Sequence, residues 1–158
     1  MTFVKKIGQA LLGITLLGSP ALAEPAETSK AAGTNASWLV IQTASEVQFD
    51  GETITLKNVD PSVIMFTARP TRIAEAIPTA TFVASWDKGG AKSLKSNPPN
   101  AALTSIVEGK LQSATVELSA PRLDGTTLIF KVRVIEGIVP AEGKTASLFI
   151  DSCFTCMG

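Results

Sequence analysis

The last residues of the chain carry three sulfur side chains at close spacing: Cys153, Cys156 and Met157. In an oxidising compartment, a Cys-x-x-Cys pair predicts first a local disulfide between Cys153 and Cys156. A thiol-disulfide role is a second interpretation, although the two residues after Cys156 leave no room for the helix that activates such thiols. Because all three ligands are soft, a copper site at Cys153, Cys156 and Met157 is the alternative.

A second set of candidate residues is Arg69 and Arg72, which flank Pro70 just beyond a predicted strand. Two guanidinium groups on a stiff loop can bind a carboxylate, sulfate or phosphate, so we expect a small anionic ligand there. Phe82 and Trp86 stand four residues apart, which places both rings on one face of a helix. We therefore take Arg69, Arg72, Phe82 and Trp86 as the candidate ligand-binding residues.

Both parts of that candidate site also have a structural interpretation. The arginines can pair with Asp60 or Asp87, or simply face water, as most loop arginines do. Aromatic residues at helical spacing more often lie in a core than in a ligand groove.

The composition excludes several kinds of enzyme. The chain has no histidine and no tyrosine, which removes Ser-His-Asp and Cys-His hydrolases and histidine-bound zinc or haem. Serine-lysine and carboxylate pairs remain open, but no spacing singles one out. We predict no cofactor and favour a protein that is not an enzyme.

The first 23 residues have the order of a secretory signal peptide. Lys5 and Lys6 precede an apolar run from residue 7 to 17, and Pro20 stands before the small residues Ala21-Leu22-Ala23. This pattern predicts cleavage before Glu24 and a periplasmic or secreted protein. The apolar run is too short to span a membrane, and no other segment resembles a span.

The remaining chain suits a single domain with no strong charge. Loss of Lys5 and Lys6 leaves 12 basic against 14 acidic residues, a net charge of −2. Such a chain offers no electrostatic surface for nucleic acid. Residues 24–36 are small and polar and predict a flexible leader, residues 37–151 a β-domain, and residues 152–158 a Cys-x-x-Cys tail.

Short apolar runs separated by turn residues characterise the domain. Asp50-Gly51 and Asp124-Gly125 are strong hairpin signals between alternating runs. One short helix is expected from Thr79, as its cap, to Trp86, followed by a long loop to Asn100. We therefore predict a mainly β fold, an antiparallel sandwich or open barrel of about seven to eight strands with one short helix.

Several segments together resemble an uncharacterised family of small exported bacterial β-rich proteins. The motifs are Phe66 with Arg69 to Ala74, Thr79 with Phe82 and Trp86, Pro98 to Ala101, and Ser147 to Asp151. The resemblance implies a single exported domain and carries no activity. An acid often precedes Arg-Pro in such sequences, whereas this chain has Ala68.

The sequence thus predicts an exported, non-enzymatic β-domain with a binding or structural role in the cell envelope. Its partner is an unknown envelope protein or a small anionic ligand. The alternative is a periplasmic thiol-disulfide or copper-binding protein that acts through Cys153, Cys156 and Met157.

Overall fold

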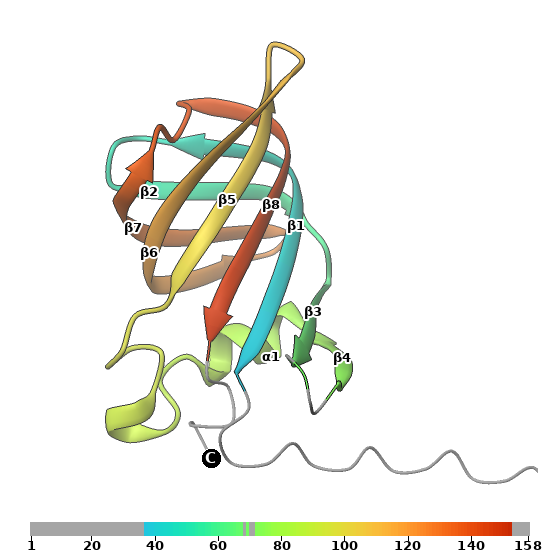
Figure 1. The fold of residues 1–158 in the computed structure, drawn as a ribbon, viewed down its shortest axis with the longest axis vertical. Coiled ribbons are helices and arrows are strands. Elements are labelled where there is room, and N and C mark those ends of the chain that lie inside the picture. Colours follow the sequence, from blue (N-terminus) through green and yellow to red (C-terminus); the bar gives the residue numbers. More distant parts are fainter. Residues whose placement is uncertain (1–36, 68, 70–71, 153–158) are drawn as a thin grey trace, which may run out of the picture.

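The computed structural model describes residues 37–67, 69 and 72–152 as eight antiparallel strands, one α-helix and one turn of 3-10 helix (Figure 1). This confirms the mainly β prediction. The elements are β1 (Trp38–Phe49), β2 (Thr53–Val59), β3 (Ser62–Thr67), β4 (Ala74–Pro78), α1 (Thr79–Ser85), η1 (Gly90–Lys92), β5 (Asn100–Val107), β6 (Lys110–Asp124), β7 (Thr127–Gly137) and β8 (Glu142–Ser152). No helix among them is long and apolar enough to cross a membrane.

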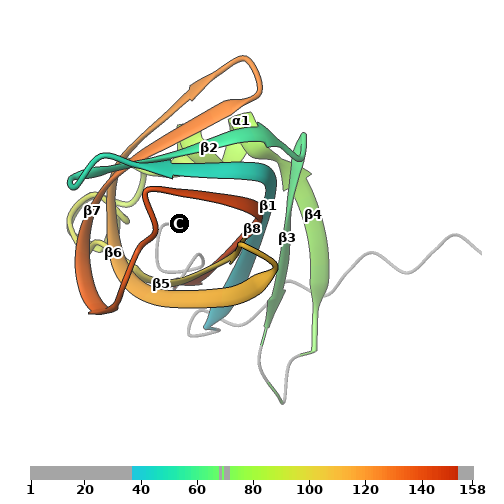
Figure 2. The same ribbon diagram turned by 90° about the horizontal axis from the view of Figure 1, so that it is seen from above.

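Six of these strands close into a barrel. The sheet runs in the order β2-β7-β6-β5-β8-β1-β3-β4, and an additional pairing of β2 with β1 joins the ring (Figure 2). β3 and β4 lie outside the ring as an extension from β1. The pairing of β1 with β2 therefore settles the choice between sandwich and barrel in favour of a barrel.

The first strand is the element that joins the ring to its extension. One edge of β1 pairs with β8 along nearly its whole length. Its other edge pairs with β3 through Trp38 to Ile41 and then with β2 through Ala44 to Phe49. The sequence pattern alone predicts two separate runs here, a strand from Trp38 to Thr43 and an alternating run with Val47 and Phe49, because small and polar residues interrupt the apolar alternation between them. The structure has a single strand of 12 residues.

The strand β4 has no counterpart in the sequence-based prediction. It pairs only with β3 and forms one edge of the sheet. Four of its five residues are exposed, and only Ile77 is half-buried. An exposed edge strand lacks the alternation of buried and exposed residues by which strands are recognised in a sequence.

The barrel interior is apolar. The outer surface has apolar residues over β3, β1 and β8 but carries charged side chains over β6 and β7. Fully buried residues from the ring include Ile54, Leu56, Leu103, Leu118, Leu128, Phe130, Leu148 and Ile150. On the outer surface, three apolar residues are paired in register across β3, β1 and β8: Ile64, Ile41 and Phe149. On β6 and β7, the outward Glu117 and Arg133 form an ion pair instead.

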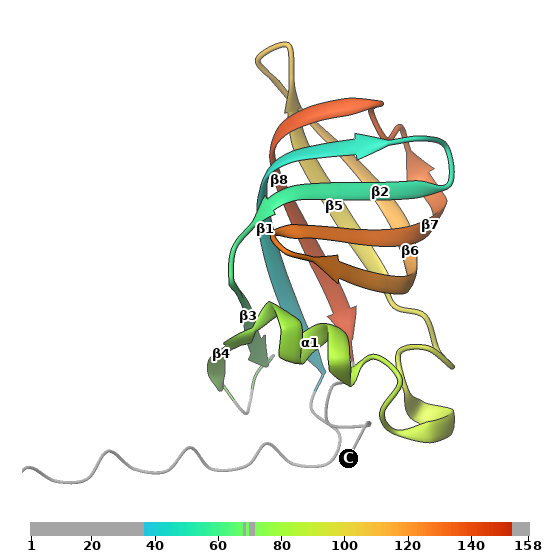
Figure 3. The same ribbon diagram turned by 180° about the vertical axis from the view of Figure 1, so that it is seen from behind.

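The helix α1 packs across the lower end of the barrel (Figure 3). Phe82 and Trp86 are both buried, and their rings meet edge to face with centroids 5.8 Å apart. Trp86 also contacts Phe130 of the barrel, at 5.6 Å. The two rings thus meet on one side of the helix as predicted, edge to face and not stacked, and they join α1 to the core.

The predicted N-cap of this helix is wrong. Pro78 precedes the first turn, and Thr79 is its first residue, without a side-chain capping bond. The buried Thr79 hydroxyl instead lies 2.8 Å from the Asp60 carbonyl oxygen and 3.0 Å from Gln42 Oε1. Gln42 Nε2 donates to the same Asp60 carbonyl at 3.2 Å. This buried polar cluster ties the start of α1 to β1 and to the β2–β3 turn.

Stability should fall on the acid side of pH 4. Lys144 bonded to Glu46, Arg133 bonded to Glu117, and backbone N–H groups bonded to Asp50 all lower the pKa of these carboxyl groups. A lowered pKa stabilises the folded state above the unfolded pKa of about 4, and this contribution is lost as the pH falls through the folded value.

Thermal unfolding between pH 7 and pH 2 measures this effect. The triple variant Glu46→Gln, Asp50→Asn and Glu117→Gln should show a flatter acid-side decline than the unmodified chain. An identical decline in both would contradict the assignment.

Candidate ligand-binding cleft

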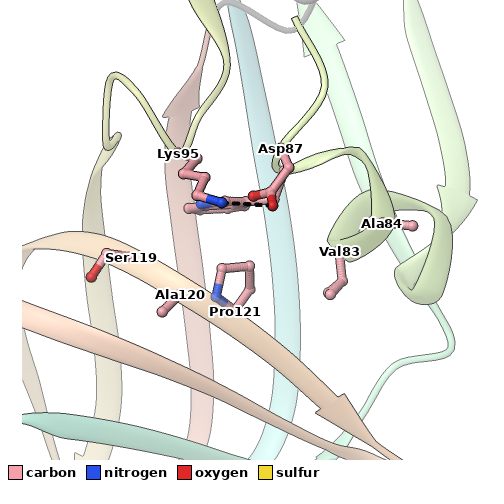
Figure 4. Close-up of a pocket in the computed structure, with 8 residues that line it drawn as sticks. Val83, Ala84, Asp87, Lys95, Ser119, Ala120 and Pro121 are labelled. Carbon is pink, nitrogen blue, oxygen red and sulfur yellow. Dashed lines mark hydrogen bonds and ion pairs between the residues drawn. The ribbon is translucent and has the colours of Figure 1, made fainter. Parts of the chain in front are cut away.

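A cleft of about 560 Å³ lies between α1 and the middle of β6. We call it the helix cleft. Its residues come from the helix, the segment after it and the strand, and Figure 4 shows the Asp87–Lys95 pair across from β6. The lining residues are Val83, Ala84, Trp86, Asp87, Lys95, Ser119, Ala120 and Pro121. Its volume is in the range of small-molecule sites, roughly 300–1,000 Å³.

The wall of the helix cleft formed by β6 is an irregular stretch of strand. The register with β7 shifts between Ser119 and Arg122, and Ala120 has a φ of +47°. Pro121 has no N–H to donate, which is tolerated at a bulge. Bulges re-aim side chains and are frequent beside functional sites, where a non-glycine residue at positive φ is also concentrated.

Trp86 lines the cleft and carries an unsatisfied hydrogen-bond donor. The residue is 2% exposed, and its indole Nε1 is buried without a hydrogen-bond partner among the described residues. An indole N–H can only donate, so it needs an acceptor. Leaving a buried donor unpaired costs about 1–3 kcal/mol, so the indole N–H of Trp86 is a candidate donor to a water or a ligand in the cleft.

An exposed ion pair borders the cleft. Lys95 Nζ lies 3.0 Å from Asp87 Oδ2, and the two side chains are 68% and 66% exposed. The backbone N–H of Lys95 also donates to the Trp86 carbonyl oxygen at 3.1 Å, which brings the two backbones together at the border of the cleft. Ion pairs this exposed contribute only about 0–1 kcal/mol. The lysine is therefore free to exchange its partner.

Of the four residues predicted as a ligand site, Trp86 lines the helix cleft. Arg69 and Arg72 are exposed on the connection between β3 and β4 and are not among the residues that line this cleft. Phe82 is fully buried and presents no surface to a ligand. The expected acidic partners are engaged elsewhere, Asp87 with Lys95 and Asp60 with Thr43.

Sequence reasoning missed the rest of the helix cleft. Lys95 lies in a segment predicted as a loop, and Ser119, Ala120 and Pro121 lie just beyond a strand predicted to end at Leu118. Pro121 was the available signal, because a proline within a strand indicates an edge or a bulge. Nothing in the sequence pairs this bulge with a helix more than thirty residues earlier.

A smaller cleft of about 310 Å³ lies at the end of β8, with Lys92, Asn97, Asp151 and Ser152 among its lining residues. Ser152 Oγ is also buried, with no hydrogen-bond partner in residues 37–67, 69 and 72–152. A hydroxyl both donates and accepts and rotates to suit its neighbours, so it defines a ligand less sharply than an indole N–H. The helix cleft is therefore the stronger candidate.

Cys153, Cys156 and Met157 lie outside the described residues, and their disulfide and copper interpretations remain predictions. Intact-mass measurement of the protein from its own compartment, with and without thiol alkylation, distinguishes them. We expect a chain that starts at Glu24, lacks two hydrogens and resists alkylation. Two alkylated thiols, or a copper adduct lost on denaturation, would contradict the disulfide.

Comparison of this chain with protein-family models, with curated proteins and with solved structures finds no match. In residues 37–67, 69 and 72–152, no three or more acidic or sulfur side chains gather as metal ligands would.

Proposed function

We propose that this protein is an exported, non-enzymatic binding domain that holds a small molecule in the helix cleft. The observation that carries the proposal is Trp86, which lines a cleft of ligand size and whose buried indole N–H has no acceptor within the part of the chain that the structure describes. The signal-peptide pattern of residues 1–23 supports a role in the periplasm or outside the cell.

The chemistry of the helix cleft favours binding over catalysis. Its two ionisable side chains, Asp87 and Lys95, are paired with each other and largely exposed. Its one hydroxyl, Ser119 Oγ, donates to the Lys131 carbonyl oxygen at 3.2 Å. A nucleophile needs an adjacent base to activate it, and the residues that line this cleft offer no such pair.

A matched pair of helix variants tests the proposal. Ala84 and Ala80 are both exposed on α1, but only Ala84 lines the cleft. Ala84→Trp adds bulk at a residue that lines the cleft and should obstruct it, whereas Ala80→Trp adds the same bulk one turn earlier on the helix, at a residue that does not line it. Native mass spectrometry of the protein recovered from the periplasm should then detect a small-molecule adduct on the unmodified chain and on Ala80→Trp only.

Two results would contradict the proposal. One is an adduct that persists on Ala84→Trp, which would place the ligand elsewhere. The other is the absence of an adduct on the unmodified chain together with no thermal stabilisation of this chain by any member of a small-molecule library.

A further inference from the structure

We infer that the ligand of the helix cleft carries a carboxylate group attached to a small apolar body. This inference rests on the proposed function and names its ligand class. The carboxylate accepts a hydrogen bond from Trp86 Nε1 and takes Asp87's place as the partner of Lys95.

The first argument is the direction of the unsatisfied hydrogen bond. Trp86 Nε1 can only donate, so the ligand atom that meets it must be an acceptor. A hydrogen bond to a charged acceptor is about twice as strong as one between neutral groups. An ammonium or other donor-only ligand would leave the indole N–H unsatisfied.

The second argument is the positive charge that lines the same cleft as Trp86. Lys95 is bonded through its backbone to Trp86, and among the described residues its ammonium group pairs with the exposed carboxylate of Asp87. A ligand carboxylate that also bonds to the indole would offer Lys95 a less hydrated partner than Asp87 does. Asp87 is thus a competitor for Lys95 and repels an incoming anion.

The third argument is the nature of the remaining walls. Val83 on α1 points toward Pro121 on β6 (Figure 4), and Ala84 and Ala120 also line the cleft. These side chains carry no polar atoms, so they suit the apolar part of a ligand. A molecule with a single polar end therefore matches the cleft better than a sugar or a polyol, which needs many hydrogen-bond partners.

Three probes of one shape separate the ligand classes: benzoate, benzamide and benzylamine. The protein has two tryptophans, so a ¹H–¹⁵N spectrum contains two indole signals, and the spectrum of Trp38→Phe assigns them. Titration with benzoate should move the Trp86 indole signal downfield and saturate. Benzamide should bind more weakly, and benzylamine should leave the indole signal in place.

Substitutions at the cleft give the second readout. Trp86→Phe should weaken benzoate about tenfold, the amount expected for a bond to a charged acceptor. Trp38→Phe is its control, since Trp38 Nε1 is equally buried and unpartnered but Trp38 does not line the cleft. Lys95→Gln should weaken benzoate a few-fold, whereas Asp87→Asn should strengthen it a few-fold.

The variant Asp87→Asn decides between the charge classes. A cationic ligand would lose affinity in this variant, and a neutral one would not change. If benzylamine or benzamide binds the cleft better than benzoate, the carboxylate inference fails while the proposed function stands. If none of the three moves any signal from the residues lining the cleft, and library ligands that do bind move signals elsewhere, both fail.

Discussion

Replacement of Phe82 by alanine should lower the free energy of unfolding by about 3–5 kcal/mol, the largest effect we expect from a single substitution. Phe82 is fully buried, and its ring packs edge to face against Trp86, which in turn contacts Phe130 of the barrel. Because α1 has only seven residues, too few to be stable alone, its place on the barrel depends on this aromatic group.

Chemical denaturation at neutral pH measures this change. Thr81→Ala is the matched control, since Thr81 is exposed on the same helix and should change the unfolding free energy by no more than about 0.5 kcal/mol. A loss of less than 1 kcal/mol on Phe82→Ala would show that α1 is not anchored through this ring.

The second large effect is expected at Gly143 of β8. A Cβ atom there would lie 2.7 Å from Ser105 Oγ, 2.8 Å from Ser105 Cβ and 3.2 Å from Val47 Cγ1. Gly143→Ala should therefore cost about 1–3 kcal/mol through overpacking in a rigid interior. The glycine is required by the space that its neighbours fill, because no left-handed backbone conformation distinguishes it.

A double-mutant cycle tests this explanation. Ser105→Gly removes both of the closest atoms, and the Ser105 hydroxyl makes no hydrogen bond that would be lost. In the Ser105→Gly background, Gly143→Ala should cost less than about 1 kcal/mol. Equal costs in the two backgrounds would mean that the contact with Ser105 is not the reason for the glycine.

The parts of the fold that follow from local chemistry were predictable. Both Asp-Gly hairpins are present: Gly51 and Gly125 adopt positive φ in the turns between β1 and β2 and between β6 and β7. Residues that alternate between apolar and polar formed strands, and the spacing of Phe82 and Trp86 marked the helix.

The candidate site could not be predicted in the same way, because it depends on tertiary contacts. The helix cleft forms only where α1 lies against the irregular stretch of β6. The barrel that holds β6 in place is closed by the pairing of β1 with β2. The sequence indicated Trp86 correctly as a residue of interest. The prediction grouped Trp86 with Arg69 and Arg72, because two arginines on a stiff loop are a pattern typical of an anion site. That pattern carries no information on whether a cavity lies beside the loop.

The most direct test of the proposed site is backbone chemical-shift mapping during titration with benzoate. We expect the perturbed amide signals to cluster at Val83 to Asp87, at Lys95 and at Ser119 and Ala120, with the rest of the barrel unchanged. Perturbations confined to the loop that carries Arg69 and Arg72, or spread evenly over the surface, would contradict a binding site in the helix cleft.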